Sequence, residues 1–171
     1  MMANNQMNKG ELIMFREMRR SKQSISEDAI LSLLENVKRG VLALHGDHGY
    51  PYAIPLDFYY EPKQNRIYFH GSKVGHKIDA IKRNPKACFT IYGNEFYKQN
   101  EWAPYVQSVI AFGQCHLISD EEEIQYVLYQ LAKKYYPNEE MIQPMINAHL
   151  HAVQIFALDI EHITGKQIQE E

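Results

Sequence analysis

The chain has 171 residues, enough for one compact domain with a single hydrophobic core. Charged residues make up 23% of the chain and the formal net charge is -3, so composition gives no sign of a disordered chain or a nucleic-acid-binding surface. No run of about eighteen apolar residues is present, and the N-terminal residues lack the apolar centre of a signal peptide. We therefore expect a cytoplasmic protein with neither a membrane nor a nucleic-acid partner.

The first segments in chain order are an arm and a helix. Residues 1–20 mix polar and basic residues with one apolar cluster at Leu12–Phe15, which predicts an N-terminal arm before a body at 21–171. The arm is expected to dock on that body or on a partner. A helix is predicted over Ser26–Lys38, because Ser26 can cap it and apolar residues recur on one face. Gly40 is expected to stop it.

Strands and turns dominate the middle of the chain. The predicted strands and connections follow in order: a strand at Val41–Leu44, a hairpin loop at His45–Gly49, a strand at Tyr52–Tyr60, a turn at Glu61–Asn65, a strand at Arg66–His70, a loop at Gly71–Gly75, a short helix at His76–Asn84 and a strand at Ala87–Tyr92. Cys88 lies in the last of these strands and Cys115 in the next. We expect both to be reduced core residues, because two cysteines in apolar runs do not indicate a disulfide framework.

The last third begins with a long strand, Tyr105–Ile118, which is predicted to bend at Gly113. It is followed by a helix over Asp120–Tyr135, a shorter one over Met141–Leu150, a strand at Ala152–Ile160 and a polar tail. Five or six strands joined by tight turns, with few crossover helices, favour a mainly β fold with flanking helices. We expect a small antiparallel barrel rather than a doubly wound parallel sheet.

The stretch from Arg66 to Asn84 carries the clearest chemical signal, because a glycine-bearing loop that leads into a helix exposes unpaired backbone N–H groups. Ser72 adds a hydroxyl donor, and Lys73 and Lys77 add positive charge. The pattern predicts a phosphate site. A solvated loop followed by an ordinary capped helix is the alternative reading of the same residues.

The order of several segments makes the pattern more specific. They are Met18–Arg20, Gly40–Leu44, Gly49–Leu56, Ile67–His70, Gly75–Lys77, Asn84–Pro85, Ser108–Gly113 and Ile163–Lys166. Together they resemble the flavin (FMN-binding) split-barrel superfamily, and within it the branch of 5-nitroimidazole resistance proteins related to pyridoxamine 5′-phosphate oxidase. The resemblance implies a homodimer of six-stranded antiparallel split β-barrels, with FMN held at the subunit interface.

The resemblance also implies residue roles. It assigns phosphate contacts to Ser72 and Lys77, with His70, Gly71 and His76 nearby. It further implies that Ile54, Pro55 and Leu56 offer backbone groups to the flavin ring, that Ser108 approaches from the second subunit, and that His70 serves the chemistry. Pro55 suits such a strand because it has no N–H and normally lies at a sheet edge or a bulge. An edge-strand proline without a ligand is the alternative.

Other residues carry weaker signals. The pairs His45 with His48 and His149 with His151 lack cysteine or carboxylate partners at matching spacing, so we predict no metal site. Trp102, Tyr97 and Tyr105 could stack on a flavin or a substrate, or could be packing anchors at an interface.

Three functional hypotheses follow. The first is an FMN-dependent, nitroreductase-like oxidoreductase that passes electrons from a small-molecule donor such as a reduced nicotinamide to a small-molecule acceptor. The second is a flavin-binding or redox-sensing module without turnover. The third is a relative that binds haem or a deazaflavin. Pyridoxamine 5′-phosphate oxidase activity is a further alternative, although no second basic cluster for a substrate phosphate is evident.

Overall fold

The structure is a computed structural model that describes residues 15–136 and 138–169. Its main element is one antiparallel sheet whose strands are ordered β2-β1-β5-β6-β7-β4-β3. The strands are β1 (Arg39–His45), β2 (Pro51–Asp57), β3 (Tyr59–Glu61), β4 (Arg66–Ser72), β5 (Lys86–Tyr92), β6 (Tyr105–Leu117) and β7 (Val153–Gln169). The chain is therefore mainly β, as predicted.

The sheet curls strongly, and its connectivity shows why. Strands β2 and β3 are the two edges of the sheet, yet Phe58 alone separates them in the chain. A flat sheet cannot bring its outermost strands this close, so the sheet must roll until its edges meet. Phe58 is fully buried at this junction and packs edge-to-face on Phe89 at 4.9 Å between ring centroids.

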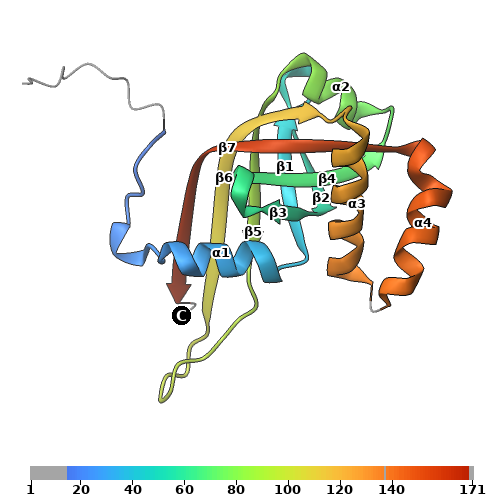
Figure 1. The fold of residues 1–171 in the computed structure, drawn as a ribbon. Helices are drawn as coiled ribbons and strands as arrows, with labels where there is room; N and C mark the ends of the chain where they lie inside the picture. The colour runs from blue at the N-terminus through green and yellow to red at the C-terminus, as the bar shows by residue number, and fades with distance from the viewer. Residues whose placement is uncertain (1–14, 137, 170–171) are drawn as a thin grey trace, which may run out of the picture.

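Within the described residues, four α-helices flank the curled sheet: α1 (Glu27–Asn36), α2 (His76–Arg83), α3 (Glu121–Tyr135) and α4 (Ile142–His149). Helices α3 and α4 lie side by side at one end, and α1 crosses the sheet near the ends of β6 and β7 (Figure 1). Ser26 caps α1, as predicted, by accepting a hydrogen bond from the Ala29 N–H at 3.3 Å. The main core fills the inside of the curl, and a smaller core lies between the sheet and α3.

Two predictions of strand number and length are wrong. The sheet has seven strands rather than five or six, because the predicted strand Tyr52–Tyr60 divides at Phe58 into β2 and β3, which pair with different partners. The predicted polar tail after Ile160 is the second half of β7, which runs to Gln169. The thirteen-residue β6 pairs along its length with β7 and so orders these polar residues.

Three smaller predictions also meet the structure. Helix α1 ends at Asn36, before Gly40, which lies instead inside β1. The bend at Gly113 is confirmed, because the β6–β7 register shifts between Phe112 and Gly113. Both cysteines are free, as predicted, and Cys88 is only half-buried.

The predicted N-terminal arm lies mostly outside the described residues, since Leu12, Ile13 and Met14 belong to the part of the chain that is not described. Phe15 stacks on His162 at 4.8 Å between ring centroids and lies 5.7 Å from Phe112. Among the described residues, no helix is long and apolar enough to cross a membrane.

Candidate functional site

Three elements of the predicted flavin site meet at one end of β4. They are the last residues of β4 (His70–Ser72), the first residues of α2 (His76 and Lys77) and the edge strand β2, which packs near β4. We call these residues and the free edge of β2 the cradle. The structure thus brings together most of the residues that the sequence pointed to.

The start of α2 leaves two backbone donors unused within the helix. Gly75 precedes the helix with φ of 118°, a conformation that favours glycine, and its carbonyl accepts the N–H groups of both Ile78 and Asp79. The N–H groups of His76 and Lys77 come before these and have no carbonyl one turn earlier to bond. The positive end of the helix dipole therefore faces the cradle with free donors.

Lys77 lies folded against β4. Its Nζ sits 5.3 Å from the centroid of the Phe156 ring, and the half-buried position lowers the pKa of Lys77 below its usual value. A Cβ at Gly71 would lie 2.7 Å from Nζ, so a larger residue there would require the end of the Lys77 side chain to move. Lys73, by contrast, is exposed in the loop and forms no ion pair within the described residues.

Ser72 is the last residue of β4 and is exposed beside the loop. Its Oγ lies 3.5 Å from the Val74 N–H, a long and weak hydrogen bond. The hydroxyl is therefore available to another acceptor or donor at the mouth of the cradle.

His76 ties the cradle to the β1–β2 hairpin. Its ring stacks on Tyr52 of β2 at 4.0 Å between centroids, and its Nε2 lies 3.4 Å from Asp47 in the hairpin. Asp47 also pairs with Arg83 at the end of α2 at 2.8 Å, and this hydrogen bond holds the pKa of Asp47 below its usual range. Both ends of α2 are thus linked to the same turn.

His70 has an exposed side chain at the end of β4, although the protein around its ring still desolvates it. This desolvation lowers the pKa of His70, the positive charge of Lys77 lowers it further, and the carboxylate of Asp57 opposes both. Asp57 ends β2 and pairs with Arg39 at 2.9 Å. His70 is therefore held toward its neutral form between an acidic and a basic neighbour.

The edge strand β2 presents free backbone groups. The Gly46 N–H bonds the Tyr50 carbonyl, and the same register makes Ile54 and Leu56 the residues whose N–H groups face β1. The free edge therefore carries the N–H groups of Ala53 and Asp57 and the carbonyl of Pro55. Pro55 costs no ladder bond there, which fits its position on an edge strand.

Sequence reasoning did not single out Ala53 or Asp57. The available signal was the spacing of Pro51 and Pro55, since two prolines four residues apart lie on the same edge of a strand and mark that edge as the unpaired one.

Ser108 does not reach the cradle within one chain. It lies on β6 between Tyr92 and Lys166, and β7 separates β6 from β4. It belongs instead to the outer face of the sheet, where apolar and small residues of adjacent strands line up: Val41, Ala43, Cys88, Thr90, Ile110 and Phe112. Ile110 and Phe112 are both more than a third exposed on this outer face.

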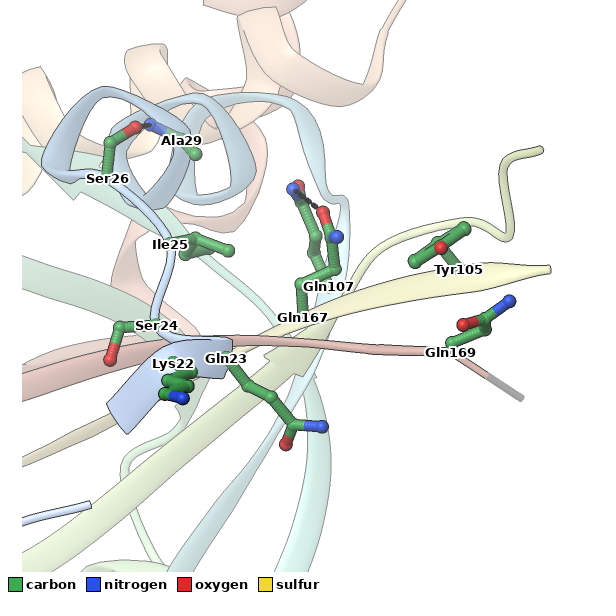
Figure 2. A pocket seen from close by; sticks show the side chains of 10 residues that line it. All are labelled: Lys22, Gln23, Ser24, Ile25, Ser26, Ala29, Tyr105, Gln107, Gln167 and Gln169. Carbon is green, nitrogen blue, oxygen red and sulfur yellow. Dashed lines mark hydrogen bonds between the residues drawn. The ribbon is translucent and has the colours of Figure 1, made fainter. Parts of the chain in front are cut away.

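Three cavities among the described residues lie away from His70, Ser72 and Lys77. One of about 440 Å³ lies between the start of α1 and the ends of β6 and β7, and glutamine, serine and tyrosine side chains line it (Figure 2). Another of about 430 Å³ opens on the outer face beside Cys88 and Phe112, and one of about 220 Å³ lies beside Lys134. His70, Ser72 and Lys77 line none of these. In the cradle, His70 and Ser72 are exposed.

The weaker candidates stay apart from the cradle. Trp102, in the segment before β6, is 81% exposed. The Tyr105 ring has the Nζ of Lys98 at 4.0 Å from its centroid. Within residues 15–136 and 138–169, no three His, Cys, Asp or Glu side chains gather as a metal site would require.

Solved structures with the same fold include three whose descriptions mention related chemistry. A protein described as a 5-nitroimidazole antibiotic resistance protein from Bacteroides thetaiotaomicron has a TM-score of 0.68 and 20% identity, over 84% of this chain and 85% of its own. The flavocytochrome Anf3 from Azotobacter vinelandii has a TM-score of 0.73 and 20% identity, over 91% and 75%. An FAD and haem binding protein from Mycobacterium smegmatis has a TM-score of 0.67 and 21% identity, over 88% and 74%.

These identities establish a shared fold. Among curated proteins no sequence matches this chain. The family model for pyridoxamine 5′-phosphate oxidase, however, matches residues 26–167. This range includes the whole cradle and every strand of the curled sheet except the last two residues of β7. The chain therefore belongs to the pyridoxamine 5′-phosphate oxidase family.

Proposed function

We propose that this protein binds FMN in the cradle and acts as an FMN-dependent oxidoreductase on a small-molecule acceptor. The observation that carries the proposal is the presence of three kinds of donor within a few residues at one end of β4: free N–H groups at the start of α2, the Ser72 hydroxyl and the Lys77 ammonium. Together they match what a phosphate dianion requires.

The rest of the cradle fits the remaining parts of FMN. The free edge of β2 alternates N–H and carbonyl groups, which suit the N–H and carbonyl edge of an isoalloxazine ring. When bound, FMN supplies one- and two-electron transfer. The chain's own residues bind it, orient it and set the hydrogen bonds around its ring. Relatives of known structure described as a flavocytochrome and as FAD-binding support a flavin rather than another phosphate compound.

His70 has the placement and protonation state for a proton-handling role. Its lowered pKa keeps the imidazole neutral near pH 7, so one ring nitrogen is free to accept a proton. A neutral histidine at the edge of the cradle can take a proton from, or return it to, a small acceptor that is reduced there.

The proposal includes a homodimer. The cradle is open on one side, and the outer face of the sheet carries Ile110 and Phe112, which a second copy would cover. Ser108 lies on that same face, so a second copy would bring its own Ser108 toward the open side of the cradle. Two equivalent FMN sites per dimer follow from this arrangement.

The decisive experiment is to incubate the purified full-length chain with FMN, remove free ligand by gel filtration, and record the absorption spectrum. We expect a yellow protein with about one FMN per chain and a mass in solution of two chains. A protein that elutes colourless, and that FMN does not stabilise against heat, would refute the proposal.

Turnover separates the enzyme from a flavin-binding module. The loaded protein is mixed with NADH or NADPH and a nitroaromatic or quinone, and acceptor reduction is followed against free FMN alone. Reduction faster than the free-FMN control supports the oxidoreductase, and its absence with all donors favours a binding or sensing role. The family's name makes pyridoxamine 5′-phosphate the comparison substrate.

A further inference from the structure

The end of α3 contacts the junction between the two edge strands, β2 and β3. Tyr135 is the last residue of this helix, and its hydroxyl accepts a hydrogen bond from the Phe58 N–H at 3.0 Å and donates to the Lys38 carbonyl. Phe58 lies between β2 and β3 and belongs to neither ladder. Its backbone N–H is buried, so without this hydroxyl it would lack an acceptor.

Lys134, the preceding residue of α3, also contacts Phe58. Its Nζ lies 3.8 Å from the centroid of the Phe58 ring and donates to the Leu34 carbonyl at the end of α1 at 3.2 Å. Two consecutive residues of α3 therefore hold the backbone and the side chain of Phe58.

Phe58 follows Asp57 directly, and Tyr59 pairs with Tyr68, so the antiparallel register places Asp57 toward His70, two residues further along β4. Strand β2 also contacts β4, and the Asp57 carboxylate acts on His70. The position of Phe58 thus decides how closely the end of β2 approaches β4. We propose that the Tyr135 hydroxyl is a positioning group for the cradle, which holds Asp57 beside His70 by fixing the backbone of Phe58. The flavin part of this inference rests on the proposed function, whereas the Asp57–His70 part does not.

The charged groups around His70 make the inference measurable. Asp57 comes from β2 and Lys77 from α2, and Arg39 of β1 pairs with Asp57. Since the carboxylate favours the protonated imidazole, drawing Asp57 away lowers the pKa of His70. A purely structural hydroxyl would alter stability and leave this pKa unchanged.

The experiment titrates His70 by NMR of its ring in the flavin-free chain, in wild type, Tyr135→Phe, Asp57→Asn and the double variant. We expect the pKa of His70 to fall in both single variants, and the double variant to fall no further than Asp57→Asn alone. Tyr129→Phe is the matched control, because that hydroxyl lies on α3 and faces Glu139 at 3.4 Å instead.

A titration in Tyr135→Phe that equals wild type would overturn the inference, even if the variant is less stable. If Tyr135→Phe does not fold, an unchanged pKa of His70 in Asp57→Asn, or rapid hydrogen exchange of the wild-type Phe58 amide, would overturn it equally. With FMN, Tyr135→Phe is expected to bind about fivefold more weakly, and Tyr129→Phe as wild type. Failure of all variants and wild type to bind FMN would refute the proposed function alone.

Discussion

The two ends of β4 differ sharply in how their polar groups are used. At the first end, Arg66 pairs with Asp159 at 2.6 Å and with Glu123 at 3.0 Å, and the Tyr68 hydroxyl donates to the same Glu123 at 2.6 Å. At the other end, the Ser72 hydroxyl and the donors of α2 have weak partners or none within the described part of the protein. The polar groups at the first end of β4, which we call the closed end, are therefore paired with one another, whereas those at the second, the open end, are left without strong partners in the described chain.

This contrast separates polar groups that serve the fold from those free to bind a ligand. Helix α3 covers the first end and supplies Glu123, so partly buried charges there are matched. Nothing in the described chain covers the second end in the same way. Substitutions at the first end should therefore change stability, and those at the second should change ligand binding.

The largest expected effect is at the bend of β6. A Cβ at Gly113 would lie 1.9 Å from the Asp159 carbonyl oxygen, an overlap that only backbone movement can relieve. Gly113→Ala should therefore lower the free energy of unfolding by about 3–4 kcal/mol, measured by urea denaturation. Gly93→Ala is the control, since its Cβ would press on the flexible end of Leu33 at 2.9 Å and meet the Gln107 carbonyl oxygen only at an ordinary 3.7 Å. Equal losses in both variants would contradict this explanation of the bend.

The next effect tests the closed end of β4. Arg66→Met removes the cation shared by Asp159 and Glu123 and should cost about 3 kcal/mol of stability while leaving FMN affinity unchanged. Arg39→Met provides the comparison, because Arg39 is largely exposed in its pair with Asp57 and should cost below about 1 kcal/mol. Weaker FMN binding by Arg66→Met would contradict this division, because it would show that the first end of β4 also contributes to ligand binding.

The sequence predicted most elements of this fold because their signals are local. Short apolar, β-prone runs bounded by turn residues mark β1, β4 and β5, Ser26 caps α1, and Gly113 marks the bend of β6. The break at Phe58 was not predictable in this way, because an apolar aromatic residue continues a strand pattern. The strand divides there because β2 pairs with β1 and β3 pairs with β4, and the Phe58 N–H left out of both ladders donates to the Tyr135 hydroxyl, 77 residues away.

The candidate site shows the same division. Residues 70–77 are contiguous, so the loop before α2 and its lysines could be recognised from the chain itself. The roles of Asp57 and Ala53 depend on which edge of β2 is unpaired and on how the sheet curls, and both are tertiary properties. Ser108 lies far from the cradle in one chain, so its predicted role depends entirely on a second copy.

The third prediction tests the open end. Lys77→Ala should weaken FMN binding by about 1.5–3 kcal/mol through loss of a charge-assisted contact, measured by flavin fluorescence quenching. Lys73→Ala should have a clearly smaller effect, because Lys73 sits in the exposed loop. Both variants should have a free energy of unfolding close to that of wild type. If Lys77→Ala and Lys73→Ala bind FMN equally well, Lys77 does not belong to the phosphate site.

The smallest expected effect is a pH dependence at Lys134, whose pKa burial lowers to about 8 from 10.5. Above pH 8 the unfolded chain holds this proton more tightly than the folded chain, so stability should rise with pH toward 10.5. Solvent reaches part of this amine, so we expect a rise below about 1 kcal/mol between about pH 7.5 and 9.5.

Urea denaturation at these two pH values measures the rise, and Lys134→Met should flatten it. Burial raises the pKa of the Cys115 thiol from 9 to about 12, which lowers stability in the upper part of this window, so the rise is read as the difference between wild type and Lys134→Met. The window ends at about pH 9.5 because burial also raises the pKa of Tyr68 and of Tyr135 to about 12, and stability from these folded-state protons is lost at higher pH. Lys133→Met is the control, since Lys133 is an exposed partner of Glu139. A rise that persists in Lys134→Met would assign it to another group.

Whether the open end of β4 holds the phosphate of a flavin can be decided by comparing FMN with riboflavin, which lacks only the phosphate. Titration calorimetry of the full-length chain should show FMN binding at least about tenfold more tightly than riboflavin, as charge-assisted phosphate contacts require. Equal affinities for the two flavins, or no binding of either, would contradict a phosphate site at this end of the strand.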